Sequence, residues 1–358
     1  MSDRINVDES PFWADRLVHA VGAIHVIAQS GRAMVRPGAP AELCDVVRIA
    51  GEVGARVGVG LGAGNHDGIE VDLSRMCNVL HLDETSLVVT AQAGITFDAL
   101  ERALGERGLM LGAVPSWARL RTVGALLAAP RPSEASPRLG RFVHTCLGIQ
   151  ALLPDGTEIA TRLAPRKATG PDLMHAIVGA RGTLGMITAA TLRVQRRQDT
   201  RLSAAFAHPT LPSALSAARA LLVRGGRPVE LTVSAAGVVS LDVDGPEPLA
   251  AAEVALAAEV TRAHGGEPVP HAPPPRWLTP PHERGVALER VDAEVLAPAL
   301  VGDAVRVVGW HTGGACVVDS ARPPAAPPAL SPLVAALKKR LDPQDRFVAW
   351  PVNDRLPH

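Results

Sequence analysis

A run of closely spaced glycines is the clearest candidate for ligand binding in this sequence. Gly60, Gly62 and Gly64 follow a short apolar run and are themselves followed by Asn65 and His66. Backbone N–H groups can close around a pyrophosphate only where side chains leave room, and glycine leaves the most. The same spacing also suits a plain turn between two strands. The run therefore indicates either a phosphate-binding loop or a structural turn.

His311 is the best candidate for acid–base chemistry. It lies in Trp310-His311-Thr312-Gly313-Gly314, between two runs that predict strands. A neutral imidazole could take a proton from a substrate carbon or hydroxyl near neutral pH. A structural turn histidine is the alternative. Because the chain has no tyrosine, any acid or base must be of another residue type.

Arginine is the residue type expected to bind a small anionic substrate, because its planar guanidinium matches a carboxylate. Arg276, Arg284 and Arg306 are available in the second half of the chain. The sequence does not choose among them, and a solvated surface arginine is the alternative for each.

Composition excludes several other classes of function. Thirty-six basic residues balance thirty-six acidic ones, which argues against nucleic acid or an anionic membrane as the partner. The four cysteines are far apart and there is no HxxH or HExxH, so we expect no metal site and no disulfide framework. We also expect no membrane span and no secretory signal, and hence a cytoplasmic protein.

Periodicity predicts two successive α/β regions. The segment 195–199 is polar and indicates the boundary between them. The turn Pro154-Asp155-Gly156 predicts a hairpin, and Pro343 should end the last helix. Before the boundary we expect helices at 12–29, 41–53, 97–106 and 172–178, and strands at 56–60, 68–73, 86–91, 148–153 and 182–192. After it we expect strands at 202–207, 229–234 and 238–244, and helices at 212–223, 249–264 and 333–341.

Five stretches, in order, resemble the FAD-binding domain of the vanillyl-alcohol-oxidase (PCMH-type) family. They are the glycine-rich turn with the helix before it, Val71–Met76, Asp83–Thr96, Pro115 with Thr122-Val123-Gly124, and Thr169–Leu192. The last is the most specific and is closest to the alkylglycerone-phosphate synthase branch. The chain length and Leu341-Asp342-Pro343 are more similar to the small glycolate-oxidase-E-type subunits. The resemblance covers about 34–195.

The resemblance implies an α+β fold, with a two-subdomain PCMH-type FAD-binding domain followed by a smaller α/β cap domain. It places an N-terminal helical segment at 1–31 and the FAD-binding domain at 32–198. A substrate or cap domain would follow at 199–325. A C-terminal helix at 326–358 would return to the FAD domain.

The resemblance also implies a non-covalent FAD site. His66 could instead attach the flavin covalently, although a loop histidine beside Asp67 is the more common situation. The implied cofactor-binding residues are Gly60, Gly62, Gly64, Asn65, His66, Pro115, Thr122, Val123, Gly124, Gly182, Thr183, Gly185 and Ile187.

Departures from the family pattern leave an alternative open. Leu61 and Ala63 interrupt the glycines, Trp117 and Arg119 crowd the loop after Pro115, and Arg181 stands where the family usually has an acidic residue. These changes favour a relative with weakened or lost flavin binding.

The expected function is an FAD-linked oxidoreductase, or a subunit of one, acting on a small oxygenated substrate such as a 2-hydroxy acid. His311 would be its base, and other subunits of a complex are possible partners. One alternative is a flavin-free scaffold or regulatory subunit. A second is an ether-lipid enzyme similar to alkylglycerone-phosphate synthase.

Overall fold

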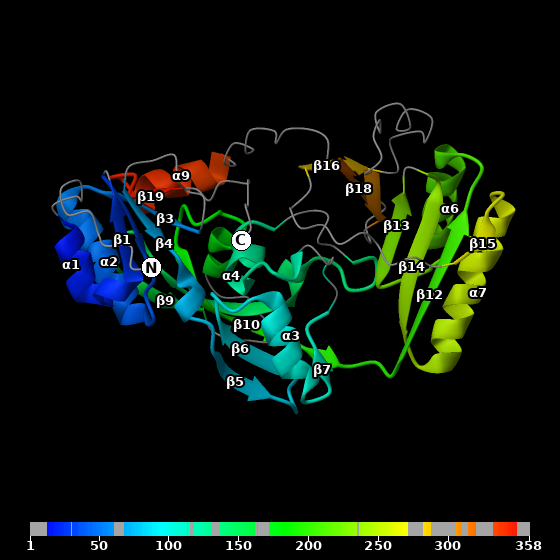
Figure 1. Cartoon of the computed structure of the whole chain (residues 1–358), viewed down its shortest axis with the longest axis horizontal. Helices are drawn as coiled ribbons and strands as arrows, with labels where there is room; N and C mark the ends of the chain where they lie inside the picture. Colours follow the sequence, from blue (N-terminus) through cyan, green and yellow to red (C-terminus); the bar gives the residue numbers. More distant parts are fainter. Residues whose placement is uncertain are drawn as a thin grey trace, which may run out of the picture.

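The computed structural model describes most of the chain in three main sheets (Figure 1). The described residues are 13–29, 31–60, 68–112, 114, 118–130, 136–161, 163, 172–234, 236–270 and 332–348, with the backbone of 282–287, 305–309 and 314–319. Helices and sheets are mixed throughout, and the sheets contain both parallel and antiparallel pairs. The predicted α+β class is confirmed.

The first sheet has the order β1-β2-β4-β3-β19. Its strands are β1 (Val26–Gln29), β2 (Arg32–Val35), β4 (Gly68–Val71), β3 (Arg56–Val59) and β19 (Phe347–Val348). All neighbouring pairs are parallel except the edge pair β1–β2. Helices α1 (Ala14–Val21) and α2 (Pro40–Val53) contribute the buried Leu17, Leu43 and Val46 to its core.

The helix predicted over 12–29 is wrong in its second half. α1 ends at Val21, and Gly22 then takes a positive φ of +87°. Glycine adopts this conformation without steric cost and commonly ends helices. The chain continues through a short 3₁₀ turn, η2 (Ala23–His25), into strand β1.

The second sheet is antiparallel, with the order β5-β6-β10-β8-β9. Its strands are β5 (Val79–Asp83), β6 (Val88–Gln92), β10 (Met186–Arg193), β8 (Cys146–Leu152) and β9 (Glu158–Ala160). Around it lie α3 (Phe97–Gly105), α4 (Val123–Ala128), α5 (Leu173–Ile177), the 3₁₀ turns η3 (Leu73–Arg75) and η6 (Phe142–Thr145), and the short pair β7 (Leu109–Met110) and β11 (Gln195–Arg196). The first two sheets share one hydrophobic core.

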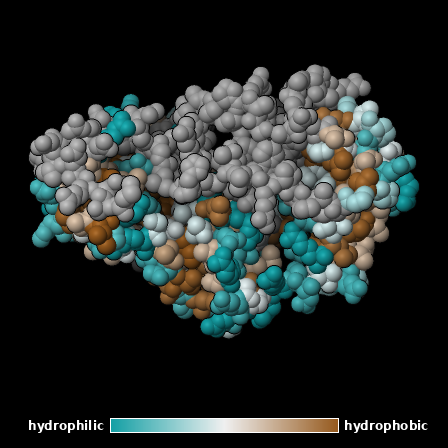
Figure 2. All heavy atoms as spheres, in the orientation of Figure 1, coloured by the Kyte–Doolittle hydropathy of each residue, from teal (hydrophilic) through white to brown (hydrophobic). Residues whose placement is uncertain are grey.

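The hairpin predicted around Pro154-Asp155-Gly156 is confirmed, since β8 pairs with β9. β5 is an edge strand, and Figure 2 shows apolar residues gathered over β5 and β6, where Val79 and Leu80 are exposed.

The third sheet has seven strands and its own core at the other end of the molecule (Figure 1). Helices α6 (Leu211–Val223) and α7 (Glu247–Ala263) cover one face, on which Leu231, Val239 and Leu241 are buried. Its strands, in spatial order, are β15 (Glu267–Val269), β12 (Thr200–Ala207), β14 (Val238–Gly245), β13 (Glu230–Ser234), β17 (Val305–Gly309), β18 (Gly314–Asp319) and β16 (His282–Ala287).

The end of the described chain joins the sheet that contains its first strands. α9 (Pro332–Leu341) leads into β19, which pairs with β3 at the edge of the first sheet. Figure 1 shows this red segment next to the blue N-terminal sheet. No helix in the described part of the chain combines the length and apolar character that crossing a membrane requires.

Candidate functional site

The predicted phosphate loop connects two adjacent parallel strands. β3 and β4 are paired in register from Arg56 and Gly68 at one end to Val59 and Val71 at the other. The connection must therefore run back along the strands by about 10 Å, at roughly 3.3 Å per residue. Parallel neighbours are usually joined by a longer crossover that contains a helix. Here only residues 60–67 separate β3 from β4.

Both ends of this loop require glycine for backbone reasons. Gly60 has a φ of +105°, and its N–H donates to the carbonyl of Val71 at 2.9 Å. A Cβ on Gly68 would lie 2.4 Å from the carbonyl oxygen of Arg56. A bare backbone of this kind fits the approach of a phosphate group. Gly62, Gly64, Asn65 and His66 lie outside the described residues.

Thr122, Val123 and Gly124 form the start of α4. Thr122 is the N-cap, and its hydroxyl oxygen accepts a hydrogen bond from the N–H of Ala125 at 3.1 Å. The N–H of Val123 donates to Ile95, and the N–H of Gly124 donates to Ala93, both at 2.8 Å. These N–H groups are therefore used within the protein. Pro115, the other residue predicted in this region, lies outside the described residues.

A turn at Arg181 and Gly182 is hydrogen-bonded to the end of α4. Thr183, Gly185 and Ile187 follow this turn. The N–H of Arg181 donates to the carbonyl of Ala128 at 2.9 Å. Arg181 and Gly182 both have positive φ, so the predicted strand starts only at Met186. Thr183 is buried and its hydroxyl donates to the carbonyl of Ala180 at 2.6 Å, while Ile187 is buried within β10.

The segment Ala93-Gly94-Ile95 joins these two regions. The N–H of Ala93 donates to the carbonyl of Thr188 in β10 at 2.9 Å, and the carbonyls of Ala93 and Ile95 accept from the start of α4. A Cβ on Gly94 would lie 1.8 Å from the carbonyl oxygen of Leu73. Sequence reasoning did not include this segment among the site residues. The sequence feature that could have identified this segment is Gly94, a glycine between two apolar residues within a stretch that resembles the family.

Helix α3 fastens both ends of the loop that contains Pro115. On one side, the carboxylate of Glu101 accepts the N–H of Leu111. On the other, Asp98 accepts two hydrogen bonds from Arg119, at 3.0 and 2.8 Å, and Arg119 also lies over the ring of Phe97. The arginine expected to crowd this loop is thus held against α3.

Three side chains in this region have shifted pKa values. Burial raises the pKa of Glu101, and the hydrogen bonds from Arg119 lower the pKa of Asp98. Burial also lowers the pKa of Arg181.

Comparison with known proteins decides what this arrangement is. Residues 31–162 match the family model described as an FAD binding domain. That range contains the β3–β4 loop, the segment 93–95 and the start of α4. Residues 31–162 are therefore similar to FAD-binding domains, and the chain shares the fold of an alkyldihydroxyacetonephosphate synthase and of a 4-ethylphenol oxidase. This similarity supports FAD as the cofactor.

Relatives and solved structures agree with this assignment. An uncharacterized FAD-linked oxidoreductase, YgcU, of Escherichia coli K12 is 30% identical over 161 residues, covering 45% of this chain and 33% of the relative. Mitochondrial D-lactate dehydrogenase [cytochrome] 1 of Saccharomyces cerevisiae is 32% identical over 161 residues, 44% of this chain and 27% of that protein. The chain therefore matches a third or less of the length of these relatives.

An alkyldihydroxyacetonephosphate synthase structure superimposes with a TM-score of 0.68 at 18% identity, covering 87% of this chain and 75% of the other. This similarity extends the shared fold beyond the FAD-binding domain to the seven-stranded sheet.

The seven-stranded sheet turns its polar face toward the FAD-binding domain. Asp242 on this face accepts hydrogen bonds from Ser203 at 2.5 Å and from Arg201 at 2.6 Å. From the FAD-binding domain, Arg138 pairs with Asp244 on the same face, and Ser136 donates to the carbonyl of Val229 at 2.6 Å. Because of these contacts, a ligand bound to the FAD-binding domain would meet the polar face of the sheet and not the face that α6 and α7 cover.

His311 falls in the connection between β17 and β18, outside the described residues. Within the described residues, no three histidine, cysteine or acidic side chains are grouped as a metal site would require. His175 pairs with Asp172 at 2.7 Å on the surface.

Proposed function

We propose that this protein is an FAD-linked oxidoreductase, or a subunit of one, that acts on a small oxygenated substrate such as a 2-hydroxy acid. The observation that carries the proposal is the polar sheet face fastened to the FAD-binding domain through Arg138 and Asp244. The polar side chains on such a face can form hydrogen bonds with a polar substrate beside the cofactor. FAD, when bound, supplies the acceptor for a hydride. The similarity to a D-lactate dehydrogenase supports the substrate class.

Three stretches of the FAD-binding domain would hold the cofactor. The loop from Gly60 to His66 would surround the pyrophosphate. The start of α4 and the segment from Gly182 to Ile187 would pack against the cofactor. The N–H groups of Val123, Gly124 and Thr183 are already hydrogen-bonded within the protein. His311 would take the proton from the substrate.

Strand register favours Arg306 as the residue that binds a substrate carboxylate. Arg306 pairs with Ser234, which shares a sheet face with Glu230 and Thr232, the polar face. Arg284 pairs with Val317, which in turn pairs with Val307 of β17. Val307 pairs with the buried core residue Val233, so the register position of Arg284 is on the opposite face from that of Arg306. Arg276 lies outside the described residues.

The purified protein tests the proposal directly. We expect it to show the absorbance bands of oxidised flavin, which should bleach without oxygen when D-lactate or glycolate is added. Arg306→Gln should raise KM for the hydroxy acid far more than the matched variant Arg284→Gln. Loss of kcat in His311→Asn with unchanged FAD content would support His311 as the base. Absence of flavin, with no thermal shift on adding FAD, would support the flavin-free alternative.

A second candidate is an ether-lipid synthase, to which the similarity to alkyldihydroxyacetonephosphate synthases points. The same spectrum separates the two proposals. An oxidoreductase leaves the flavin reduced after one anaerobic turnover, whereas a synthase that uses flavin without net reduction leaves it oxidised as product forms.

A further inference from the structure

We infer that residues 332–348 act as a C-terminal latch whose Lys338–Asp342 pair holds β3 in the position from which the FAD phosphate loop begins. FAD affinity then depends on the latch, although the latch and the loop are far apart in sequence. This inference rests on FAD binding and is independent of the substrate and of the reaction.

The latch covers the outer edge of β3. Phe347 and Val348 pair with Val57 and Gly58, and the N–H of Val57 donates to the carbonyl of Arg346 at 2.6 Å. Phe347 is 1% exposed and belongs to the core shared by the first two sheets. Without this strand, β3 would be an edge strand with unpaired N–H and C=O groups.

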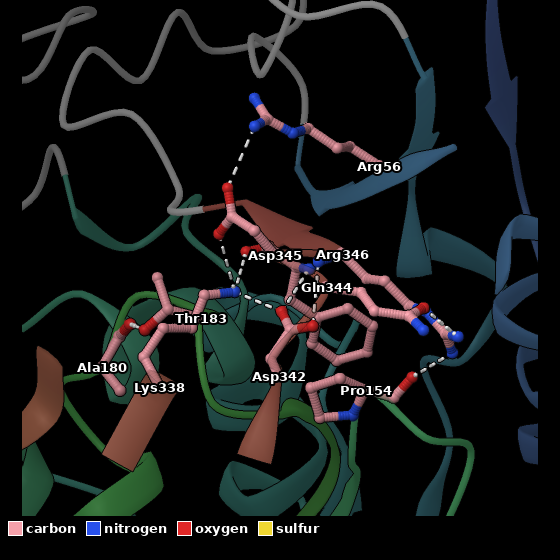
Figure 3. Close-up of polar contacts among 10 residues, drawn as sticks. Arg56, Pro154, Ala180, Thr183, Lys338, Asp342, Gln344, Asp345 and Arg346 are labelled. Carbon is pink, nitrogen blue, oxygen red and sulfur yellow. Dashed lines mark hydrogen bonds and ion pairs between the residues drawn. The ribbon is translucent and has the colours of Figure 1, made fainter. Parts of the chain in front are cut away.

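A buried ion pair fixes the turn between α9 and β19 (Figure 3). The Asp342 side chain is 1% exposed and pairs with Lys338. Its two oxygens also accept the N–H groups of Arg346 at 2.9 Å and Phe347 at 2.8 Å. The ammonium of Lys338 donates in addition to the carbonyl of Phe347 at 2.6 Å. Because a buried carboxylate is costly without such partners, the turn is held in one geometry.

Further contacts attach the latch to elements on either side. Arg346 donates to the carbonyl of Pro154 at 3.3 Å, in the β8–β9 turn. A Cβ on Gly51 of α2 would lie 2.7 Å from the Arg346 guanidinium, so that glycine leaves room for the arginine. Arg56, at the start of β3, pairs with Asp345 at 3.0 Å. The latch therefore contacts both sheets of the FAD-binding domain.

The phosphate loop begins immediately after the paired part of β3. Gly58 is the last residue of β3 that pairs with the latch, and Gly60 turns the chain toward the loop with its N–H on Val71. A shift of β3 at Val57 and Gly58 must therefore move the start of the loop. By linkage, FAD bound in the loop must stabilise the latch by the same free energy.

The test compares FAD binding in variants of the full chain. Lys338→Met and Asp342→Asn should each weaken FAD binding by roughly tenfold, within the range typical of coupled sites. The Kd is measured by quenching of flavin fluorescence, well below the melting temperature of each variant and without substrate. Lys338→Arg keeps the charge and should retain most of the affinity.

A variant with a comparable loss of stability elsewhere is the control. Leu241→Ala truncates a side chain in the core of the seven-stranded sheet and should lower Tm while leaving the FAD Kd unchanged. In the wild-type protein, FAD should slow hydrogen exchange at the amides of Val57 and Phe347.

The inference is overturned if the folded latch variants bind FAD with wild-type affinity, or if FAD does not change exchange at Val57 and Phe347. The exchange measurement decides the matter even where Lys338→Met does not fold. Since neither readout involves turnover, an inactive protein that still shows this coupling would contradict the proposed function alone.

Discussion

Ala93 accepts a hydrogen bond from the N–H of Gly124 at 2.8 Å, while its own N–H donates to Thr188 at 2.9 Å. One residue thus joins the start of α4 to strand β10. The start of α4, strand β10 and the turn that leads into β10 together carry most of the described residues that the sequence predicts to contact FAD. Their relative position depends on a segment whose backbone is bonded on both sides.

This junction predicts that Gly124→Ala is harmful. A Cβ at Gly124 would lie 2.9 Å from the Cβ of Ala93 and 3.0 Å from its carbonyl oxygen. We expect a loss of about 1–3 kcal/mol in unfolding free energy from overpacking, with weaker FAD binding. Urea denaturation and flavin fluorescence measure the two effects. Gly105→Ala in α3 is the control, since only the flexible Arg197 side chain lies nearby, and it should be neutral or stabilising.

Two substitutions of Glu101 should have opposite effects on the stability of the protein. Burial raises its pKa above the ordinary 4.5, so folding favours the neutral carboxyl. Glu101→Gln keeps an acceptor for the N–H of Leu111 and should preserve or increase stability at pH 7. Glu101→Leu leaves that N–H without its acceptor and should cost about 1–3 kcal/mol.

The pH dependence of this effect has a defined sign. A raised folded-state pKa gives a contribution that is present below pH 4.5 and lost as the pH rises through the folded value. The stability advantage of Glu101→Gln over wild type should therefore grow with rising pH. Chemical denaturation at several pH values measures it, and an advantage that shrinks would contradict this account.

The buried His208 should make the stability of the seven-stranded domain sensitive to acid. It is 6% exposed, its Nδ1 lies 3.4 Å from the carbonyl of His264, and its Nε2 has no hydrogen-bond partner among the described residues. Burial lowers its pKa below 6.5. The stability contribution is therefore present above pH 6.5 and is lost as the pH falls through the lower folded-state value.

Thermal melts between about pH 7.5 and about pH 5.5, which is roughly one unit on either side of an ordinary histidine pKa, test this prediction. His208→Gln should flatten the pH dependence of Tm. His175→Gln, which removes an exposed histidine, should keep the wild-type dependence. Equal slopes in wild type and His208→Gln would show that another group is responsible.

Cys44 should react with alkylating reagents more slowly than the exposed Cys77. Burial and the hydrogen bond to Glu158 raise its pKa to about 11. The reactive thiolate is then scarce at pH 8, about three units lower. Cys77 is exposed and should be alkylated first by iodoacetamide, as peptide mass spectrometry would show. Glu158→Gln should speed alkylation at Cys44, and an unchanged rate would contradict the role of Glu158.

Local sequence patterns determined the regular elements well. The helix expected over 41–53 is observed as Pro40–Val53, the last helix is observed as Pro332–Leu341, and Pro154-Asp155-Gly156 forms its hairpin. Such elements depend on the period of apolar residues and on turn residues, which a sequence displays directly. The segment 12–29 failed because its apolar spacing continues through Gly22, where the backbone conformation changes.

The family resemblance also identified the FAD-binding domain, because glycines at fixed spacing mark where the backbone must turn or approach a ligand. Their detailed roles needed the tertiary structure. Gly94 is required because the carbonyl of Leu73 lies against it, and the amides of Val123 and Gly124 turned out to be bonded within the protein.

The family resemblance implied that the C-terminal helix returns to the FAD domain, but the individual contacts between distant parts of the chain were beyond the sequence. Nothing near Val57 predicts that Phe347 will pair with it, and nothing near Asp244 predicts Arg138 as its partner. Side-chain periodicity describes which face of an element is buried. It does not say which strand or side chain arrives there, because that depends on how the whole chain packs its apolar faces into a shared core.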